Sequence, residues 1–398
     1  MSELPLKGVR VLDVSAVLAA PVTSTFLGDF GAEVVKIEEP GVGDFTRGRA
    51  TTPGGRSPQW LQEARNKKSV TLNLRSREGQ DLLKQMIPHF DVMVTNYRPP
   101  TLERWGMGPE ALEALNPQGI FVFITGYGLT GPYAGRGSFD RIASSFSGLT
   151  YTSGEADGDP IRCGYAVVDF MSAYLAAFSV VTALYHRDMR GGSGQVIDLA
   201  LYEGGLRATE ESVIDYSLTG AIRGRTGNSS PFMVPASDFT TADNRRISLH
   251  AATDTLFRKL AGLMQCKEFL EDDRYATRSS RMEHPNEIYG KIADWIARYD
   301  ADDVVTMLND AGVPASPVMN MADLFRDPHI AARGNLLAVE DEEFGPVQMV
   351  APIPKLSKTP GRVRSLGPKL GAHNEEILSG LLGLEADEIA ALAAKGVV

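Results

Sequence analysis

An isolated aspartate, Asp169, is the most distinctive candidate for chemistry in the sequence. It is the only charged residue between Gly164 and Tyr185, in a stretch otherwise rich in apolar and small side chains. A carboxylate in such a stretch either carries a large desolvation cost or lies at a helix start, where backbone N–H groups stabilise it. The pattern alone leaves two interpretations open: an aspartate that caps a helix, which is the commoner use, and a carboxylate that reacts.

Five arginines form a second candidate group. Guanidinium groups suit phosphate oxygens, and a ligand with a diphosphate and a further phosphate needs several of them. Each arginine alone is a weak signal, because most arginines in any protein lie on solvated surface. The group comprises Arg47, Arg75, Arg98, Arg104 and Arg136.

Other catalytic and cofactor motifs are missing from the sequence. The six histidines are scattered without metal-ligand spacing, so we expect no metal site. No G-x-S-x-G elbow or Walker A motif occurs. The one G-x-G-x-x-G, at Gly126, Gly128 and Gly131, runs into Pro132 where a dinucleotide fingerprint needs a helix, so we interpret it as a loop. Asp169 remains the leading candidate for a nucleophile.

The elements that must position these residues indicate a doubly wound α/β domain. Residues 9–14 and 33–38 are buried strand patterns on either side of a helix at 21–30. The alternation continues with strands at 70–74, 91–96 and 120–125 and helices at 77–87 and 109–115. Ligands of such sheets bind beyond the carboxyl ends of the strands, so the expected binding edge comprises residues 15–20, 96–104 and 126–140.

The rest of the chain predicts a second domain and a return to the first. A helix at 167–187, interpreted as a buried core helix, leads into a strand at 195–201. After a polar stretch at 219–230 come a strand pair at 237–241 and 247–250 and several charged helices. We predict a large domain over 1–218, a small domain over 219–320 and a return segment over 321–398 that completes the large domain.

Composition narrows the classes of partner. The net charge of −10 and the pI near 5.2 argue against a general nucleic-acid or anionic-membrane surface. The two cysteines, Cys163 and Cys266, are typical of a reducing cytosol, and residues 1–7 lack a signal-peptide pattern. We therefore expect a cytoplasmic protein that binds neither nucleic acid nor membrane.

Several sequence blocks resemble the family III CoA-transferases, which include formyl-CoA transferase, carnitine CoA-transferase and the α-methylacyl-CoA racemases. The resemblance extends over nearly the whole chain and implies a large Rossmann-like doubly wound domain built from both termini, a smaller α+β domain and an interlocked homodimer. The blocks are GVRVLD at 8–13, LGDFGAEVVKIE at 27–38, GDFTR at 43–47, NKKSV at 66–70, DVMVTNYRP at 91–99 and GYGLTGPY at 126–133.

The same resemblance assigns roles to particular positions. Asp169 matches the catalytic aspartate of the family. Coenzyme A is implied as a co-substrate, with no resident cofactor, and the implied partners are an acyl-CoA and a small carboxylic acid. The positions implied for CoA binding are Val17, Leu18, Ala19, Leu72, Asn73, Leu74, Arg75, Asn96, Tyr97, Arg98, Arg104, Arg136, Gly137, Phe139 and Asp140.

The implied reaction is CoA transfer through a mixed anhydride and an aspartyl-CoA thioester. The alternatives are a 2-methylacyl-CoA racemase or epimerase and an inactive CoA-binding subunit. Racemases carry a histidine in the loop after the Gly-Pro-Tyr block, where this sequence has Phe139, which favours transfer. We expect residues 224–230 to form a lid, and the candidates for selecting the acceptor acid are Arg223, Arg225, Asn228 and His250.

Overall fold

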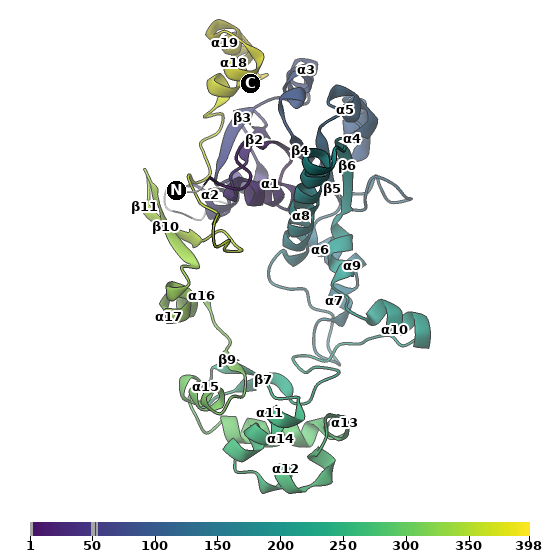
Figure 1. Ribbon diagram of the computed structural model, residues 1–398, viewed down its shortest axis with the longest axis vertical. Coiled ribbons are helices and arrows are strands. Elements are labelled where there is room, and N and C mark those ends of the chain that lie inside the picture. The colour runs from purple at the N-terminus through teal and green to yellow at the C-terminus, as the bar shows by residue number, and fades with distance from the viewer. Residues whose placement is uncertain (1–2, 49–51, 53–54) are drawn as a thin grey trace. The chain divides into compact units, whose positions relative to one another are not determined.

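The computed structural model describes residues 3–48, 52 and 55–398 (Figure 1). Its internal contacts divide the chain into two compact units. The large unit comprises Met1–Leu149, Cys163–Asp215 and Ala331–Val398, and the small unit comprises Thr150–Arg162 and Tyr216–Ile330. The large unit is therefore built from both ends of the chain. The inclusion of residues 150–162 in the small unit was not predicted.

A six-stranded parallel sheet forms the centre of the large unit. Its strand order is β3-β2-β1-β4-β5-β6, and every neighbouring pair is parallel. This is a doubly wound order, with the switch in direction between β1 and β4. The strands are β1 (Arg10–Val14), β2 (Glu33–Glu38), β3 (Lys67–Thr71), β4 (Val92–Thr95), β5 (Ile120–Thr125) and β6 (Gln195–Ala200).

Helices cover both faces of this sheet, because alternate strand residues are apolar on both sides. In β5, Val122 and Ile124 belong to the core on one face, and Phe121 and Phe123 belong to the core on the other. The first face holds α1 (Ala19–Asp29), α6 (Asp140–Phe146), α8 (Val167–Arg190) and α9 (Leu201–Arg207). The second holds α3 (Arg77–Met86), α4 (Pro99–Arg104), α5 (Pro109–Leu115) and α18 (Asn374–Leu382).

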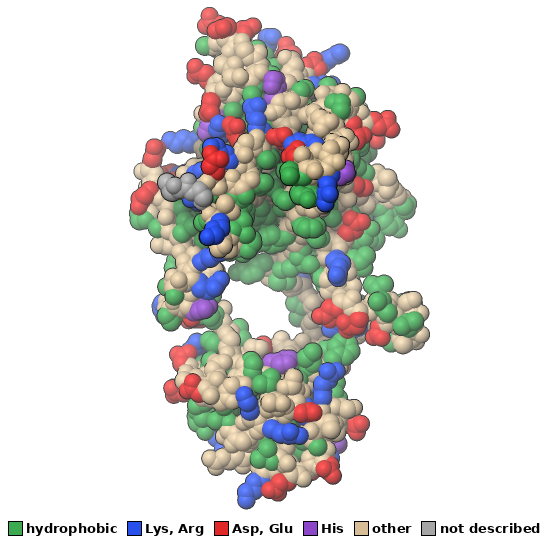
Figure 2. Space-filling view, viewed as in Figure 1, with side chains coloured by type: hydrophobic (Ala, Val, Ile, Leu, Met, Phe, Trp, Pro, Cys, Tyr) green, Lys and Arg blue, Asp and Glu red, His purple; other side chains and the backbone are tan. Residues whose placement is uncertain are grey.

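Helix α8 is buried along one side only, which corrects the prediction of a buried core helix. Val168, Val180 and Leu184 pack in the core, and Figure 2 shows hydrophobic side chains exposed over the same part of the large unit. The helix is also long and apolar enough to cross a membrane, a property that core helices of soluble proteins share. Its exposed large apolar residues are Val167, Tyr174, Leu175, Phe178, Val181, Tyr185 and Met189.

The C-terminal segment completes the large unit. Val397 and Val398 are buried in the same core cluster as Leu12, and the Asn73 N–H donates to the Val397 carbonyl at 2.8 Å. The segment contains the hairpin β10 (Leu336–Asp341) and β11 (Gly345–Val350), helix α18 and helix α19 (Ala386–Ala394). The hairpin and α19 were not predicted. Helix α2 (Pro58–Glu63) also belongs to this unit.

The small unit contains an antiparallel sheet of order β7-β8-β9. The predicted strand pair is present as β7 (Ala236–Thr240) and β8 (Arg246–His250), and β9 is Ala315–Pro317. Its helices include α11 (Asp254–Leu263), α12 (Lys267–Glu271), α13 (Arg278–Arg281), α14 (Pro285–Ile296), α15 (Ala301–Asp310) and α16 (Met321–Arg326). Three helices run across the points where the chain changes units: α7 (Leu149–Thr152), α10 (Ser212–Thr219) and α17 (Pro328–Ala332).

Candidate active site

The switch point of the sheet brings two predicted segments together. Strands β1 and β4 are neighbours, with Val14 opposite Thr95 at their carboxyl ends. The chain leaves these two strands toward opposite sides of the sheet, and ligands of doubly wound sheets bind beyond the strand ends at such a switch point. Residues 15–18 follow β1 and Asn96 follows β4, so both lie at this edge.

The loop at residues 15–18 is fixed by hydrogen bonds to its backbone. The Ala16 N–H donates to Asn96 Oδ1 at 3.0 Å, and Asn96 Nδ2 donates to the Ala16 carbonyl at 2.6 Å. Lys36 Nζ donates to the Ser15 carbonyl. The next residue, Val17, has a φ of 72°, which costs a β-branched residue about 1–3 kcal/mol. The loop is thus held in a strained conformation that leads into α1.

A buried network of charges lies behind this loop. Lys36 pairs with Asp13 at 3.5 Å and with Asp44 at 3.3 Å, and Lys67 donates to Asp13 at 2.9 Å. Burial works to raise the pKa of Asp13, but the two lysines overcome this effect and hold that pKa below its usual value. Burial lowers the pKa of Lys67. Two cations and two anions balance, and removing one partner of such a pair typically costs about 3–5 kcal/mol.

Asp169 lies in the first turn of α8, at the same edge of the sheet. The turn is placed there by Ser172, whose hydroxyl donates at 3.2 Å to the carbonyl of Leu201, the residue after β6. The helix cap is provided by another residue: Asp140 Oδ1 accepts from the N–H of Val168 at 2.8 Å and from that of Asp169 at 3.3 Å. Asp140, and not Asp169, is therefore the capping aspartate.

The carboxylate of Asp169 remains without a hydrogen bond among the described residues, although the residue is only 8% exposed. Burial, and secondly the negative charge of Asp140, raise the pKa of Asp169 to about 7. Perturbed carboxylates in clefts are typical of catalytic sites. Of the two interpretations of the sequence pattern, the capping one does not hold, because Asp140 and not Asp169 accepts from the first N–H groups of α8.

The start of α1 lies beside this first turn of α8. Leu18, Val22 and Ala173 form one hydrophobic cluster, against which Val17 and Phe170 pack. Leu18 is the N-cap of α1 and supplies no side-chain hydrogen bond, so the first N–H groups of the helix have no cap from it. N–H groups at a helix start stabilise negative charge, which suits an oxyanion that forms near Asp169.

The segment after β3 contributes mostly through its backbone. Leu72 and Leu74 are buried in the core, and Asn73 Nδ2 donates to the Gly396 carbonyl at 3.2 Å. Arg75 is exposed and pairs with Glu39 at 3.3 Å. The segment follows the carboxyl end of β3, whereas residues 72–74 were predicted to belong to the strand itself, and only Arg75 extends a charged side chain from it.

The arginines after β4 and β5 are exposed at the same edge. Arg98 is the N-cap of α4 and Arg104 is its last residue. Tyr97 packs edge-on against Trp105 at a ring-centroid distance of 4.8 Å. Arg136 stacks on Tyr133, with its guanidinium carbon 3.7 Å from the ring centroid. The neighbours Gly137 and Phe139 are exposed too, and Ala19 is buried as the first residue of α1.

Arg47 departs from the predicted phosphate-binding group. Its guanidinium donates twice to Glu38, at 2.6 and 2.8 Å, and stacks 3.6 Å from the ring centroid of Trp60. It also donates to the Pro368 carbonyl at 3.0 Å. With its donors engaged in this way, Arg47 stabilises the local structure and offers little to a ligand.

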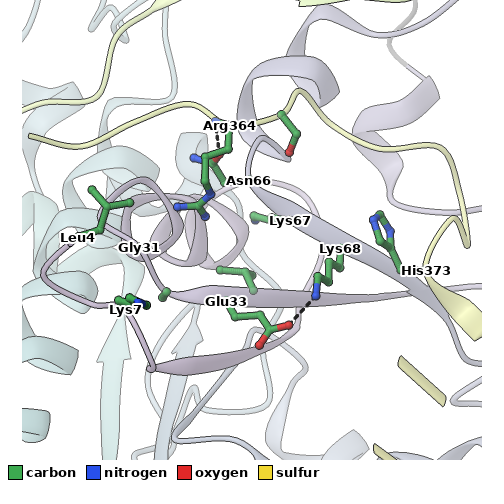
Figure 3. Close-up of a pocket in the computed structure, with 12 residues that line it drawn as sticks. Leu4, Lys7, Gly31, Glu33, Asn66, Lys67, Lys68, Arg364 and His373 are labelled. Atoms are coloured by element: carbon green, nitrogen blue, oxygen red, sulfur yellow. Dashed lines mark hydrogen bonds and ion pairs between the residues drawn. The ribbon is translucent and has the colours of Figure 1, made fainter. Parts of the chain in front are cut away.

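A cavity of about 470 Å³ lies at the opposite edge, where β2 and β3 begin (Figure 3). Lys68 pairs there with Glu33 at 2.6 Å and with Glu376 at 2.7 Å, and Arg364 donates to the Gly28 carbonyl at 3.1 Å. Because these cations already have partners, the cavity is a weaker candidate for an anionic ligand than the carboxyl edge.

The residues that support the site were not predicted from the sequence. Asp13 and Lys36 are charged residues inside buried parallel strands, where apolar runs are the rule. That placement is itself a signal, since a buried charge needs a partner. The capping role of Asp140 carries no such local signal, because its partners are 28 and 29 residues away.

The small unit brings together three of the four residues proposed to select an acceptor. Arg223, Asn228 and His250 line a cavity of about 420 Å³, together with several hydroxyl side chains and no Asp or Glu. Arg225 instead donates to the backbone carbonyls of Tyr151 and Glu155. The predicted lid, residues 224–230, belongs to this unit and forms much of the cavity wall.

Comparison with known proteins gives a consistent result. A family model described as CoA-transferase family III matches residues 6–374. The chain is 43% identical to the succinyl-CoA–D-citramalate CoA-transferase of Chloroflexus aurantiacus, over 99% of this chain and 98% of that protein. It is 32% identical to the succinate–glutarate CoA-transferase of Agrobacterium fabrum, over 96% of each. A crystal structure of a CAIB/BAIF family protein from Brucella suis superimposes with a TM-score of 0.83 at 31% identity, covering 96% of this chain and 100% of that one.

Proposed function

The chain belongs to CoA-transferase family III, a family that transfers CoA between an acyl-CoA and a carboxylic acid, and we propose that Asp169 is its nucleophile. One observation carries the proposal. The Asp169 carboxylate is buried beside the starts of α1 and α8, where it accepts no hydrogen bond from the described residues and where burial, and secondly Asp140, raise its pKa to about 7. A weakly solvated carboxylate of this kind is a stronger nucleophile than an ordinary surface aspartate.

The proposed reaction has four steps in which atoms balance. The Asp169 carboxylate attacks the donor thioester, giving a mixed anhydride and CoA thiolate. The thiolate then attacks the aspartyl carbonyl, giving an aspartyl-CoA thioester and releasing the donor acid. The acceptor carboxylate attacks this thioester to form a second anhydride, and the thiolate finally attacks the acceptor carbonyl. Coenzyme A acts throughout as a co-substrate, and no resident cofactor is invoked.

The surrounding residues have distinct tasks in this scheme. The first N–H groups of α1 stabilise the oxyanions that form at the attacked carbonyls. The exposed arginines of the carboxyl edge bind the phosphates of CoA, namely Arg75, Arg98, Arg104 and Arg136. Asp140 caps α8 and keeps the carboxylate of Asp169 at the helix start.

An oxygen-isotope experiment tests the nucleophile directly. With an acceptor acid labelled with ¹⁸O, one label per turnover enters Asp169 and then leaves in the released donor acid. Mass spectrometry of the donor acid and of the peptide that contains Asp169 follows both events. Deuterium exchange at the α-carbon of a 2-methylacyl-CoA without any acceptor would instead indicate a racemase, and CoA binding without turnover would indicate an inactive subunit.

We further propose that the donor is succinyl-CoA and that the acceptor is a second dicarboxylic acid. The relatives that match over nearly their whole length are named for succinyl-CoA, citramalate, succinate and glutarate. Within the small unit, the cavity lined by Arg223 combines a guanidinium with hydroxyl groups, and no Asp or Glu is among its described lining residues. An arginine is well suited to the free carboxylate of such a substrate.

Replacing Arg223 with methionine is expected to lower the preference for dicarboxylic acids. The kcat/KM ratio of glutarate to butyrate should fall by about 10- to 100-fold, because hydrogen bonds to a charged group contribute about 1.5–3 kcal/mol. The matched control is Arg246→Met, which removes an exposed arginine from β8 outside the cavity. An unchanged ratio in Arg223→Met would show that another residue selects the acid.

We also propose that the enzyme is a cytoplasmic homodimer, interlocked as the family resemblance implies. The exposed apolar side of α8 supports an association, since so large an apolar surface is rarely left in water. Sedimentation equilibrium is expected to give twice the chain mass of 43.0 kDa. Phe178→Asp is expected to weaken the dimer, and a wild-type mass of one chain at micromolar concentration would contradict it.

A further inference from the structure

We propose that Asn96 is a positioning residue, whose side-chain amide holds the loop at residues 15–18 in the conformation that presents the start of α1 to the reaction. The inference rests on the proposed function of Asp169. In this role, loss of Asn96 would lower kcat. The family resemblance instead implies a direct contact with CoA, whose loss would weaken CoA binding.

The geometry of the amide is specific for this task. Asn96 Oδ1 accepts from the Ala16 N–H at 3.0 Å, and Asn96 Nδ2 donates to the Ala16 carbonyl at 2.6 Å. The Asn96 side chain thus pairs with both the backbone N–H and the backbone carbonyl of Ala16, as a neighbouring β-strand would. A carboxamide offers a donor and an acceptor at this spacing, whereas an ionised carboxylate offers acceptors only.

The residue before Ala16 is held in the same way by the buried charges. The Ser15 carbonyl accepts from Lys36 Nζ, and the Ser15 hydroxyl donates to Asp13 Oδ1. Lys36 is itself fixed by Asp13 and Asp44, and its side chain is 1% exposed. Two consecutive residues of the loop are therefore anchored to rigid strands on either side of the switch point.

Val17 is the residue that needs this anchoring. A left-handed backbone at a β-branched residue persists only where its surroundings over-determine it. Val17 and Leu18 join β1 to α1, and both pack in the cluster that contains Ala173 of α8. If Val17 relaxed to negative φ, the first N–H groups of α1 would turn relative to Asp169, and the oxyanions would lose their donors.

The test is the Asn96→Asp variant, which keeps the acceptor and places a second oxygen against the Ala16 carbonyl. With succinyl-CoA and glutarate, kcat is expected to fall about 10- to 100-fold. The KM for succinyl-CoA and the dissociation constant of CoA are expected to stay within about threefold, because the anchored loop acts in the transition state. A rise in both constants at constant kcat would mark Asn96 as a ligand contact and overturn the inference.

A double variant distinguishes the loop conformation from a general loss of structure. Glycine adopts positive and negative φ almost equally, so Val17→Gly in the Asn96→Asp background is expected to recover part of kcat, about fivefold or more. The matched control is Asn116→Asp. Asn116 also bridges two backbone groups, the Phe90 carbonyl and the Gln118 N–H, but lies before β5 at the other edge of the sheet.

Asn116→Asp is expected to lower the urea midpoint as Asn96→Asp does while leaving kcat within about twofold. An equal loss of kcat in Asn116→Asp, or no recovery in the double variant, would overturn the inference. Failure of the proposed function is a separate outcome, because it would appear in the wild-type enzyme as absent transfer of ¹⁸O.

Discussion

Replacement of Asp169 with asparagine is expected to reduce CoA transfer by about 10⁴-fold or more, because the amide cannot form the anhydride. Asparagine has nearly the shape of aspartate, and Asp140 supplies the helix cap in either case. The dissociation constant of CoA should therefore stay within about tenfold, or roughly 1.4 kcal/mol. Turnover is measured with succinyl-CoA and glutarate, and CoA binding by titration calorimetry.

Trapping of the acylated aspartate with hydroxylamine is the control for this loss of activity. Wild-type enzyme mixed with succinyl-CoA and then with hydroxylamine should yield a hydroxamate at Asp169, whereas Asp169→Asn and Asp169→Ala should yield none. The wild-type rate of the first step should also increase up to about pH 7, as Asp169 ionises, and then level off. A variant that keeps a tenth of the activity after its sequence is verified by mass spectrometry would remove Asp169 from the mechanism.

The same substitution is expected to stabilise the protein at alkaline pH. The pKa of Asp169 is raised from 3.8 to about 7 in the folded state, so between these pH values the folded chain holds a proton that the unfolded chain releases. Stability conferred by the wild-type residue is therefore lost as the pH rises from about 4 to 7. Asparagine cannot ionise and avoids this loss, which is at most about 4 kcal/mol at pH 8.

Urea unfolding at pH 5 and pH 8 measures this difference. The midpoint of Asp169→Asn should exceed that of the wild type by more at pH 8 than at pH 5. Asp157→Asn, at an exposed position, removes the same formal charge and should show no such dependence. An equal difference in urea midpoint at both pH values would mean that ionisation of Asp169 does not destabilise the folded protein.

The sheet could be predicted where apolar runs have clear limits. Strands β2 and β5 begin and end at the predicted residues, 33–38 and 120–125. Strand β3 is Lys67–Thr71, whereas 70–74 was predicted. The reason is physical: Leu72 and Leu74 are buried although they follow the strand, and the charge of Lys67 inside the strand is balanced by Asp13.

The sequence allows the candidate nucleophile to be proposed, but it does not predict the residues that surround it. Asp169 is conspicuous because it interrupts a long uncharged stretch. Two features surround the Asp169 carboxylate, namely Asp140 and the start of α1. Both come from distant parts of the chain, and tertiary packing alone brings them near Asp169. Asn96 shows the same limit, since its sequence neighbours do not reveal that its amide pairs with Ala16.

The placement of the last residues in the large unit has a consequence for biosynthesis. Helix α18 and Val397 belong to the same core cluster as the first strand, so this core is incomplete until residues 374–398 have left the ribosome. The main part of the small unit, residues 216–330, is one continuous stretch and emerges earlier. Domains generally fold as units during translation. Here the small unit can fold before the large unit, although the large unit begins the chain.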